Sequence, residues 1–456
     1  MKKKLIIHIG TPKTGTTSIQ NTLYASRLSF MDYGLYYPKF LPHDHIYGFT
    51  SLFKDDPENL IFFRQKDLKS DQMNEKQTLY KNNWIKEFET FQGHCFIISA
   101  EKLSELTIDE VRKVKNFVEQ YFEEIEIIVY VRPFNALIPS AIQESIKGGF
   151  VSSSFEDLFR LCMNDKNHWI FYSNSIKSWI NIFGRESVTV RPFNKKAFKN
   201  NDLIDDFLET IGYGEVDTRK IKKFTGNESI GKYSVTLLSK LNQRFPMLKN
   251  GELNKERGLV NSWVPTYIFS SVHDEKFTLD IKYTISDAEL LNKEIDYINE
   301  YLPQNHRFDY VKSSNELTVF PKIEEIPINF YVDLLNEYHK EIEKYLKVDE
   351  FYQDLFDLIG FNKSIFIWGA GSAGIKVLNL LSKLNLTVSG FIDSDSRKIG
   401  NFFHDFRVFA PNEVFLKFKK EEVFFIVGSS YYNEITKELV DNGFKEKENY
   451  IVKHIY

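Results

Sequence analysis

Short apolar runs alternate with amphipathic segments through most of the chain. Residues 5–9, 94–99, 126–131 and 187–191 are rich in apolar, β-branched and aromatic side chains, and their length is that of buried strands. Helical patterns separate these runs. Because strands that alternate with helices are typical of a parallel sheet with helices on its faces, the pattern predicts an α/β fold in which helices flank a parallel sheet.

An apolar strand, a glycine-containing loop and an amphipathic helix follow one another near both ends of the chain. The first copy runs from residues 5–9 through a loop at 10–17 into a helix that begins near Ser18. The second copy runs from residues 364–368 through a loop at 369–374 into a helix with apolar residues at helical spacing. The sequence therefore predicts two nucleotide-type α/β units.

The composition changes after about residue 310. Pro321 and Pro327 bracket an acidic turn, and apolar residues then recur at helical spacing from Tyr331 to Leu346. We therefore predict a large domain at residues 1–310, a linker and connecting helix at 311–350, and a smaller Rossmann-like α/β domain at 351–456.

Length, composition and charge limit the class of protein. The chain has 456 residues, of which 42% are hydrophobic and 27% charged, enough for more than one globular domain. The 59 Lys and Arg against 63 Asp and Glu give a net charge of -4, which argues against nucleic acid as the main partner. The two cysteines, Cys95 and Cys162, are too few for a disulfide framework and lack the spacing of metal ligands.

The N-terminus imitates the start of a secretory signal, but its apolar run at residues 5–9 ends at Gly10. No run in the sequence approaches the roughly 20 apolar residues that a membrane-spanning helix needs. We therefore expect a cytoplasmic protein without a transmembrane segment.

The first glycine-containing loop has the pattern of an anion site. A strand, a tight turn and a helix N-terminus direct backbone N–H groups and the positive end of the helix dipole at one point, which suits a phosphate at residues 12–18. Gly10 and Gly15 have the spacing of the ATP- and GTP-binding loop, but Thr16 occupies its lysine position and the lysine is inside the loop, at Lys13. This argues against an ordinary ATP or GTP phosphotransferase. The alternative is a tight turn with threonine caps.

At these residues the sequence resembles the sulfotransferases that use 3'-phosphoadenosine 5'-phosphosulfate (PAPS). Pro12-Lys-Thr-Gly-Thr-Thr-Ser18 looks like their 5'-phosphosulfate loop, and Val129-Tyr-Val-Arg132 followed by Ser140 at a helix start looks like their 3'-phosphate site. The alternative for Arg132 and Ser140 is that they are a surface arginine and a helix cap. The resemblance, which is to bacterial carbohydrate-type members, covers roughly residues 1–310 and not the C-terminal third. It implies a donor site made by Lys13, Thr14, Gly15, Thr16, Thr17, Ser18, Arg132 and Ser140.

The resemblance implies transfer of a sulfuryl group to a hydroxyl of a carbohydrate, a surface glycan or its precursor, with 3'-phosphoadenosine 5'-phosphate (PAP) as product. By analogy with phosphoryl transfer, catalysis comes mainly from positioning and from charge stabilisation on the leaving group. Lys13 is the candidate for the residue that stabilises the negative charge on the leaving group. No carboxylate pair or histidine cluster near the loop in the sequence points to a metal, so we predict none.

The acceptor hydroxyl needs a general base, and three residues are candidates. His43 and His45 lie in a segment that looks like the catalytic histidine segment of sulfotransferases acting on uronic-acid 2-hydroxyls, and histidine suits base chemistry at neutral pH. Glu101 closes an apolar strand, where α/β enzymes bind their ligands, and other branches of the family use a glutamate. We favour His45, then Glu101, then His43. The alternative for the two histidines is that they are polar loop residues.

The second glycine-containing loop matches the dinucleotide-binding fingerprint. Gly369, Gly371 and Gly374 follow a strand and open a helix, and Asp393 ends the next strand. The unit resembles the Rossmann-like domains attached to polysaccharide-biosynthesis and sugar-modifying enzymes. It is short for a complete dehydrogenase. Two readings stay open: a site for a nucleotide or nucleotide-sugar, and a ligand-free domain that docks onto a glycan-assembly partner.

Two other functions remain open. One is a P-loop kinase with an unusual loop, which the displaced lysine disfavours. The other is a nucleotide-sensing scaffold of a glycan-assembly complex in which both loops have lost catalytic function.

Overall fold

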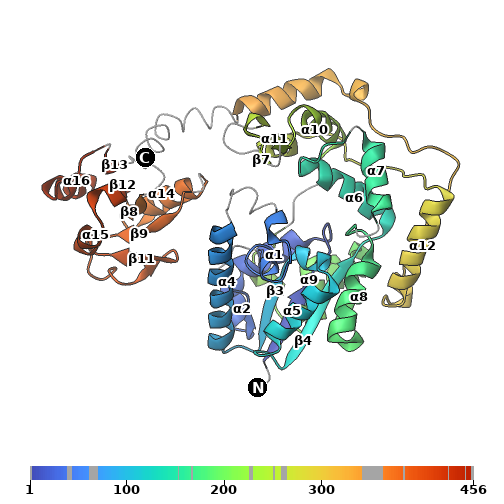
Figure 1. Cartoon of the computed structure of the whole chain (residues 1–456), viewed down its shortest axis with the longest axis horizontal. Helices are drawn as coiled ribbons and strands as arrows, with labels where there is room; N and C mark the ends of the chain where they lie inside the picture. The colour runs from blue at the N-terminus through green and yellow to red at the C-terminus, as the bar shows by residue number, and fades with distance from the viewer. Residues whose placement is uncertain are drawn as a thin grey trace. The chain divides into compact units, whose positions relative to one another are not determined.

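The computed structural model divides into two compact units, Met1–Glu337 and Tyr338–Tyr456. Figure 1 colours the first from blue through yellow to light orange and the described part of the second from orange to red. The structure describes residues 3–38, 44–60, 70–152, 154–165, 168–224, 230–249, 252–257, 264–340, 363–383, 386–429, 431–446 and 448–452. Within the predicted connecting segment, residues 328–340 are helical, and residues 341–350 lie outside the described residues.

A five-stranded sheet forms the centre of the first unit. Its strand order is β2-β3-β1-β4-β5 and every neighbouring pair is parallel. The strands are β1 Lys4–His8, β2 Leu35–Tyr36, β3 Cys95–Ser99, β4 Glu124–Val131 and β5 Val188–Pro192. The predicted fold class, a parallel sheet flanked by helices, is confirmed.

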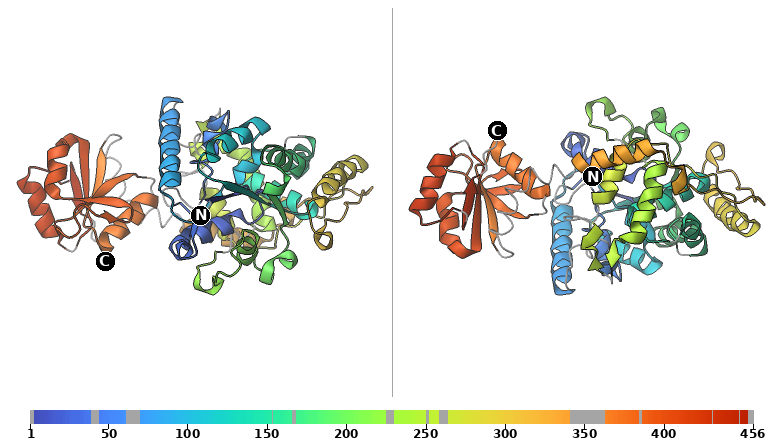
Figure 2. Two further views of the ribbon diagram at one scale, coloured as in Figure 1. Left: turned by 90° about the horizontal axis from the view of Figure 1, so that it is seen from below. Right: turned by 90° about the horizontal axis from the view of Figure 1, so that it is seen from above.

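Helices cover both faces of this sheet, which explains why its strands are apolar almost throughout. On one face Ile6 and Ile128 pack with side chains of three helices, α1 Thr16–Ala25, α2 Arg27–Met31 and α9 Leu203–Thr210. The opposite side chains, such as Ile7 and Val129, are also fully buried. There α8 Tyr172–Phe183 contacts β4 and β5 and packs against α5 Ile108–Val118. Both layers are visible in Figure 2.

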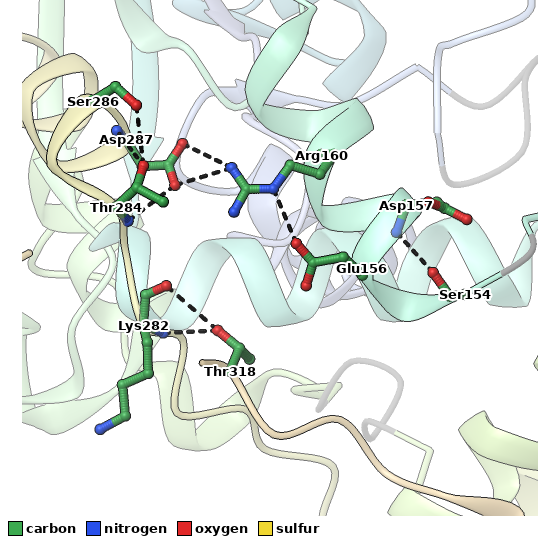
Figure 3. Close-up of polar contacts among 9 residues, drawn as sticks. All are labelled: Ser154, Glu156, Asp157, Arg160, Lys282, Thr284, Ser286, Asp287 and Thr318. Atoms are coloured by element: carbon green, nitrogen blue, oxygen red, sulfur yellow. Dashed lines mark hydrogen bonds and ion pairs between the residues drawn. The ribbon is translucent and has the colours of Figure 1, made fainter. Parts of the chain in front are cut away.

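The first unit contains further helices and a β-hairpin. The helices are α4 Ser70–Thr90, α6 Phe134–Lys147, α7 Phe155–Asn164, α10 Lys232–Arg244, α11 Val264–Ser271 and α12 Ile285–Asn299, and the hairpin joins β6 Leu248–Lys249 to β7 Glu252–Leu253. Helix α6 packs against α7 and α10. Figure 3 shows how Arg160 on α7 pairs with Glu156 on the same helix and with Asp287 near the start of α12.

The second unit is also an α/β fold with a smaller sheet. Its strand order is β10-β11-β9-β8-β12-β13, and all neighbours except β10 and β11 are parallel. The strands are β8 Ser364–Trp368, β9 Val388–Ile392, β10 Phe402–Phe403, β11 Phe406–Phe409, β12 Val423–Val427 and β13 Tyr450–Val452; the helices are α14 Ser372–Lys383, α15 Pro411–Lys417 and α16 Tyr432–Asp441. Apolar clusters lie on both faces of this sheet.

Across the described ranges, no helix is both long and apolar enough to cross a membrane.

Candidate active site

The loop between β1 and α1 is held in an unusual backbone conformation. Lys13 and Gly15 have positive φ angles of 65° and 78°, and a Cβ atom on Gly15 would come within 2.4 Å of Leu203 Cδ2. The Thr14 hydroxyl is buried and donates to the Thr11 carbonyl at 2.6 Å, which closes the turn. Thr14 therefore shapes the loop, while Thr16, Thr17 and Ser18 form the first turn of α1.

A cleft of about 370 Å³ opens beside this loop, at the carboxyl ends of β1, β3 and β4. Residues that the sequence predicted for one site line it together: Lys13, Gly15, Thr16, Thr17, Ser18, Glu101, Arg132 and Ser140. The carboxyl edge of a parallel sheet is where α/β proteins bind ligands. The structure thus brings segments far apart in the sequence into one concave surface.

Arg132 follows β4 and places its guanidinium on the wall of the cleft. Its backbone N–H donates to the Tyr172 hydroxyl at 2.8 Å, and that hydroxyl donates to the Arg132 carbonyl at 2.9 Å. The guanidinium donates to the Lys13 carbonyl at 3.4 Å and lies 5.8 Å from the centre of the Phe193 ring. No carboxylate of the described residues pairs with it, and burial lowers its pKa. An anionic ligand would supply the missing partner.

Ser140 lines the same cleft but does not begin a helix, which corrects the sequence prediction. Helix α6 begins at Phe134, with Pro133 as its cap, and continues through Pro139, so Ser140 lies in its second turn. A proline inside a helical pattern is a usual signal of a helix boundary. The surrounding packing overrides that signal here, because Leu137, Ile138 and Ile142 of the same helix are fully buried.

Glu101 lies directly after Ala100 at the end of β3, against the first turn of α1. Its carboxylate accepts a hydrogen bond from the Thr16 hydroxyl at 2.8 Å. Burial raises the pKa of Glu101, and the Thr16 hydrogen bond opposes part of that rise. A carboxyl group with a raised pKa is better matched to proton abstraction near neutral pH than an ordinary glutamate.

Lys13 points its ammonium at a residue that the sequence analysis missed. Lys13 Nζ lies 2.9 Å from Glu144 Oε2, and Lys147 Nζ lies 4.0 Å from the same atom. Burial raises the pKa of Glu144, but Lys13 and Lys147 outweigh it and hold that pKa below its ordinary value. Ser140, Glu144 and Lys147 lie three or four residues apart on α6, so they share one face of the helix. That spacing was the signal in the sequence.

Other lining residues carry no sequence signal that links them to the loop. They include Phe193, Lys276 and Phe277. The segment with Lys276 and Phe277 is fixed against α10, where the Ser234 N–H and hydroxyl donate to Asp274 at 2.9 and 2.8 Å. Phe277 also stacks on Phe155, with ring centres 6.1 Å apart. Only the fold brings this segment to the cleft.

His45, the first choice as base from the sequence, does not line the cleft. Its side chain is fully buried, its Nδ1 accepts a hydrogen bond from the Ser99 N–H at 3.1 Å, and its ring stacks on Tyr37 with centres 4.6 Å apart. This histidine ties its segment to the end of β3 rather than facing a ligand. His43 lies outside the described residues.

A second cleft, of about 490 Å³, lies in the second unit at the carboxyl ends of β8, β9 and β12. β9 and β12 flank β8 on opposite sides, so the cleft lies where the strand order reverses, the usual ligand position in such sheets. A Cβ on Gly374 would come within 2.0 Å of the Gly369 carbonyl oxygen, whereas a Cβ on Gly371 would meet nothing within 4 Å. Gly374 is thus required for packing, and Gly371 faces open space.

Asp393 holds the loop of this second cleft in place. It accepts hydrogen bonds from the Ala370 N–H at 2.9 Å and from Lys398 Nζ at 2.8 Å through one oxygen, and from the Asp395 N–H at 3.0 Å through the other. Asp395, Glu434 and Glu438 also line the cleft, with Lys398. The described residues contain no group of three or more His, Cys, Asp or Glu side chains that could hold a metal ion.

Comparisons with known proteins give partial likenesses to both units. A family model described as "C2185-like, N-terminal" matches residues 361–450. An uncharacterized protein from Archaeoglobus fulgidus is 21% identical over 255 residues, which are 55% of this chain and 65% of that protein. The chain thus spans less than two thirds of the length of this relative.

Three solved structures are similar to parts of the chain. A sulfotransferase from Alicyclobacillus acidocaldarius has a TM-score of 0.31 at 15% identity and covers 53% of this chain and 93% of its own. The sulfotransferase domain from the curacin biosynthetic pathway has a TM-score of 0.28 at 12% identity and covers 46% and 74%. The Rex-family repressor RSP has a TM-score of 0.18 at 16% identity and covers 29% and 88%.

Proposed function

We propose that this chain is a sulfotransferase that moves a sulfuryl group from PAPS to a hydroxyl of a carbohydrate. The observation that carries the proposal is that Lys13, the first turn of α1, Arg132 and Ser140 line one cleft. The sequence resemblance assigns these residues to the two ends of a single donor molecule, and that assignment requires them to face a common space.

The donor roles follow from the chemistry of the lining. The 5'-phosphosulfate lies over Thr16, Thr17 and Ser18, where helix N–H groups and hydroxyls donate to anionic oxygens. The 3'-phosphate lies at Arg132 and Ser140, because a guanidinium binds phosphate with two parallel hydrogen bonds. Phe193 and Phe277 supply aromatic surface for the adenine base.

The reaction follows from this arrangement. The acceptor oxygen attacks sulfur, the bond between sulfur and the bridging phosphate oxygen breaks, and PAP leaves with the bond's electron pair. Lys13 stabilises the charge that develops on the bridging oxygen. The acceptor hydroxyl gives its proton to Glu101, which lines the cleft and has a raised pKa. We now favour Glu101 over His45 because only Glu101 faces the cleft.

Replacing Arg132 with alanine is expected to weaken PAP binding by about 1.5 to 3 kcal/mol, which is roughly 10- to 100-fold, because charge-assisted hydrogen bonds to the 3'-phosphate are lost. Adenosine 5'-phosphosulfate has no 3'-phosphate, so its affinity should change much less. Isothermal titration calorimetry with both ligands measures the difference. Arg219→Ala is the control, since Arg219 is exposed and pairs with Asp217 outside the cleft. An equal loss for both ligands would remove Arg132 from the 3'-phosphate site.

We further propose that the second cleft binds a nucleotide or nucleotide-sugar, with its phosphate over the N-terminus of α14. The open space beside Gly371 supports this, because a phosphate must approach the backbone closely there. The bound group would present a sugar to the assembly or modification of a glycan.

Gly371→Asp should abolish nucleotide binding at the second cleft of the full chain, because a carboxylate would occupy the position of the phosphate. Gly371→Ala should fold normally, since its Cβ meets nothing within 4 Å. Titration of UDP, ADP and NAD into both variants and the wild-type chain measures the effect. If the wild-type chain binds none of the three, the unit is better explained as a docking domain.

A further inference from the structure

The ion pair between Lys13 and Glu144 sets a condition on donor binding. The ammonium that the donor needs lies 2.9 Å from a carboxylate. Glu144 lies one helical turn beyond Ser140 on α6, and both residues line the cleft. The donor and Glu144 are thus two anionic partners for one cation.

The positions of Glu144 and Lys147 allow the donor to replace Glu144 as the partner of Lys13. The Lys13 side chain is 23% exposed and that of Glu144 is 47% exposed, so the carboxylate is at the open side of the cleft and can be replaced by a ligand. Lys147 is 4.0 Å from the same carboxylate oxygen and can keep Glu144 partly neutralised when Lys13 moves. The cleft therefore contains both the competing anion and a second cation that can accept it.

We propose that Glu144 is a positioning residue that competes with the donor for Lys13 and is transferred to Lys147 when the donor binds. This inference rests on the proposed function, because it takes the donor phosphosulfate as the second partner. Glu144 holds Lys13 in an ion pair, and the donor must displace the carboxylate from that pair.

Proton linkage follows from this competition. Lys13 and Lys147 hold the pKa of Glu144 below its ordinary value. A bound anion that takes Lys13 and adds negative charge raises that pKa, so binding takes up protons and the affinity for the donor falls as the pH rises. The charged groups that act on Glu144 are Lys13, Lys102, Lys147 and Glu101, and Arg132 and Lys276 line the same cleft.

The test is calorimetric titration of PAP into the full-length wild-type chain and the Glu144→Gln variant, in buffers of different ionisation enthalpy. We expect Glu144→Gln to bind PAP about three- to tenfold more tightly, as loss of a partly exposed charge implies, and to take up fewer protons. Glu156→Gln is the matched control: Glu156 is 49% exposed and pairs with Arg160 at 3.0 Å outside the cleft (Figure 3). Its PAP affinity should equal that of the wild type.

The outcomes separate this inference from the proposed function. Wild-type chain that binds no PAP overturns the proposed function and this inference with it. Wild-type binding with unchanged or weaker binding by a folded Glu144→Gln variant overturns the inference alone. Should that variant fail to fold, Glu144→Asp retains the charge but shortens the reach to Lys13, and tighter PAP binding is again expected. Unchanged binding by Glu144→Asp would then overturn the inference.

Discussion

Replacement of Lys13 by alanine is expected to lower the turnover number about 10²- to 10³-fold, the usual effect of removing one group that stabilises developing charge. The loss in PAP affinity should be smaller, because the ammonium is needed most as the bridging oxygen becomes negative. The fold should remain intact, since the ammonium's ion pair with Glu144 is at the open side of the cleft. Steady-state kinetics with PAPS and PAP calorimetry measure the two effects.

Two further variants sharpen this test. Lys13→Arg should restore little activity, because a planar guanidinium replaces a compact ammonium. Lys249→Ala removes a lysine that pairs with Glu256 at 3.2 Å outside the cleft and should leave turnover unchanged. A Lys13→Ala variant with near-normal turnover would exclude Lys13 from the chemistry.

Replacement of Glu101 by glutamine should lower turnover about 10²- to 10⁴-fold, because the acceptor hydroxyl loses its base. Glutamine keeps an oxygen that can accept the Thr16 hydrogen bond, so the loop should be preserved. Glu101 acts as base only when deprotonated, and burial raises its pKa. The wild-type rate should therefore rise with pH through a pKa above the ordinary glutamate value, and the residual rate of the variant should lack that rise.

A matched pair of variants tests the choice of base. Glu105→Gln changes a neighbouring carboxylate that pairs with Lys102 and should retain activity. His45→Ala should lower the free energy of unfolding, since the ring is buried on Tyr37 and accepts from the Ser99 N–H, but should affect turnover little at temperatures where the chain is folded. Loss of turnover in a fully folded His45→Ala variant, with Glu101→Gln active, would restore the histidine as base.

The strands were predictable because their apolar pattern is set by burial on both faces. The expected run at 364–368 coincides with β8, and that at 94–99 differs from β3 by one residue at one end. The run at 5–9 is displaced from β1 by one residue at both ends. The edge strand β2 was missed, since a two-residue strand, Leu35–Tyr36, has no periodicity of its own.

The loop residues of the candidate site were predictable because a strand, a tight turn and a helix N-terminus are contiguous in sequence. Glu144 was missed although it lies four residues after Ser140 on the same helical face. Phe277 could not be predicted, because its place in the cleft depends on how the segment before α12 packs. His45 was misjudged for the same reason: the sequence shows a polar loop, but an aromatic cluster with Tyr37 and Trp84 encloses the ring.

The most direct test of the central claim is titration of PAP, ATP and NAD into the full-length chain and its Arg132→Ala variant. We expect PAP to bind one site in the wild-type chain more tightly than ATP, and Arg132→Ala to lose most of this affinity. Tight ATP binding without PAP binding, unaffected by Arg132→Ala, would contradict the sulfotransferase assignment and favour a kinase.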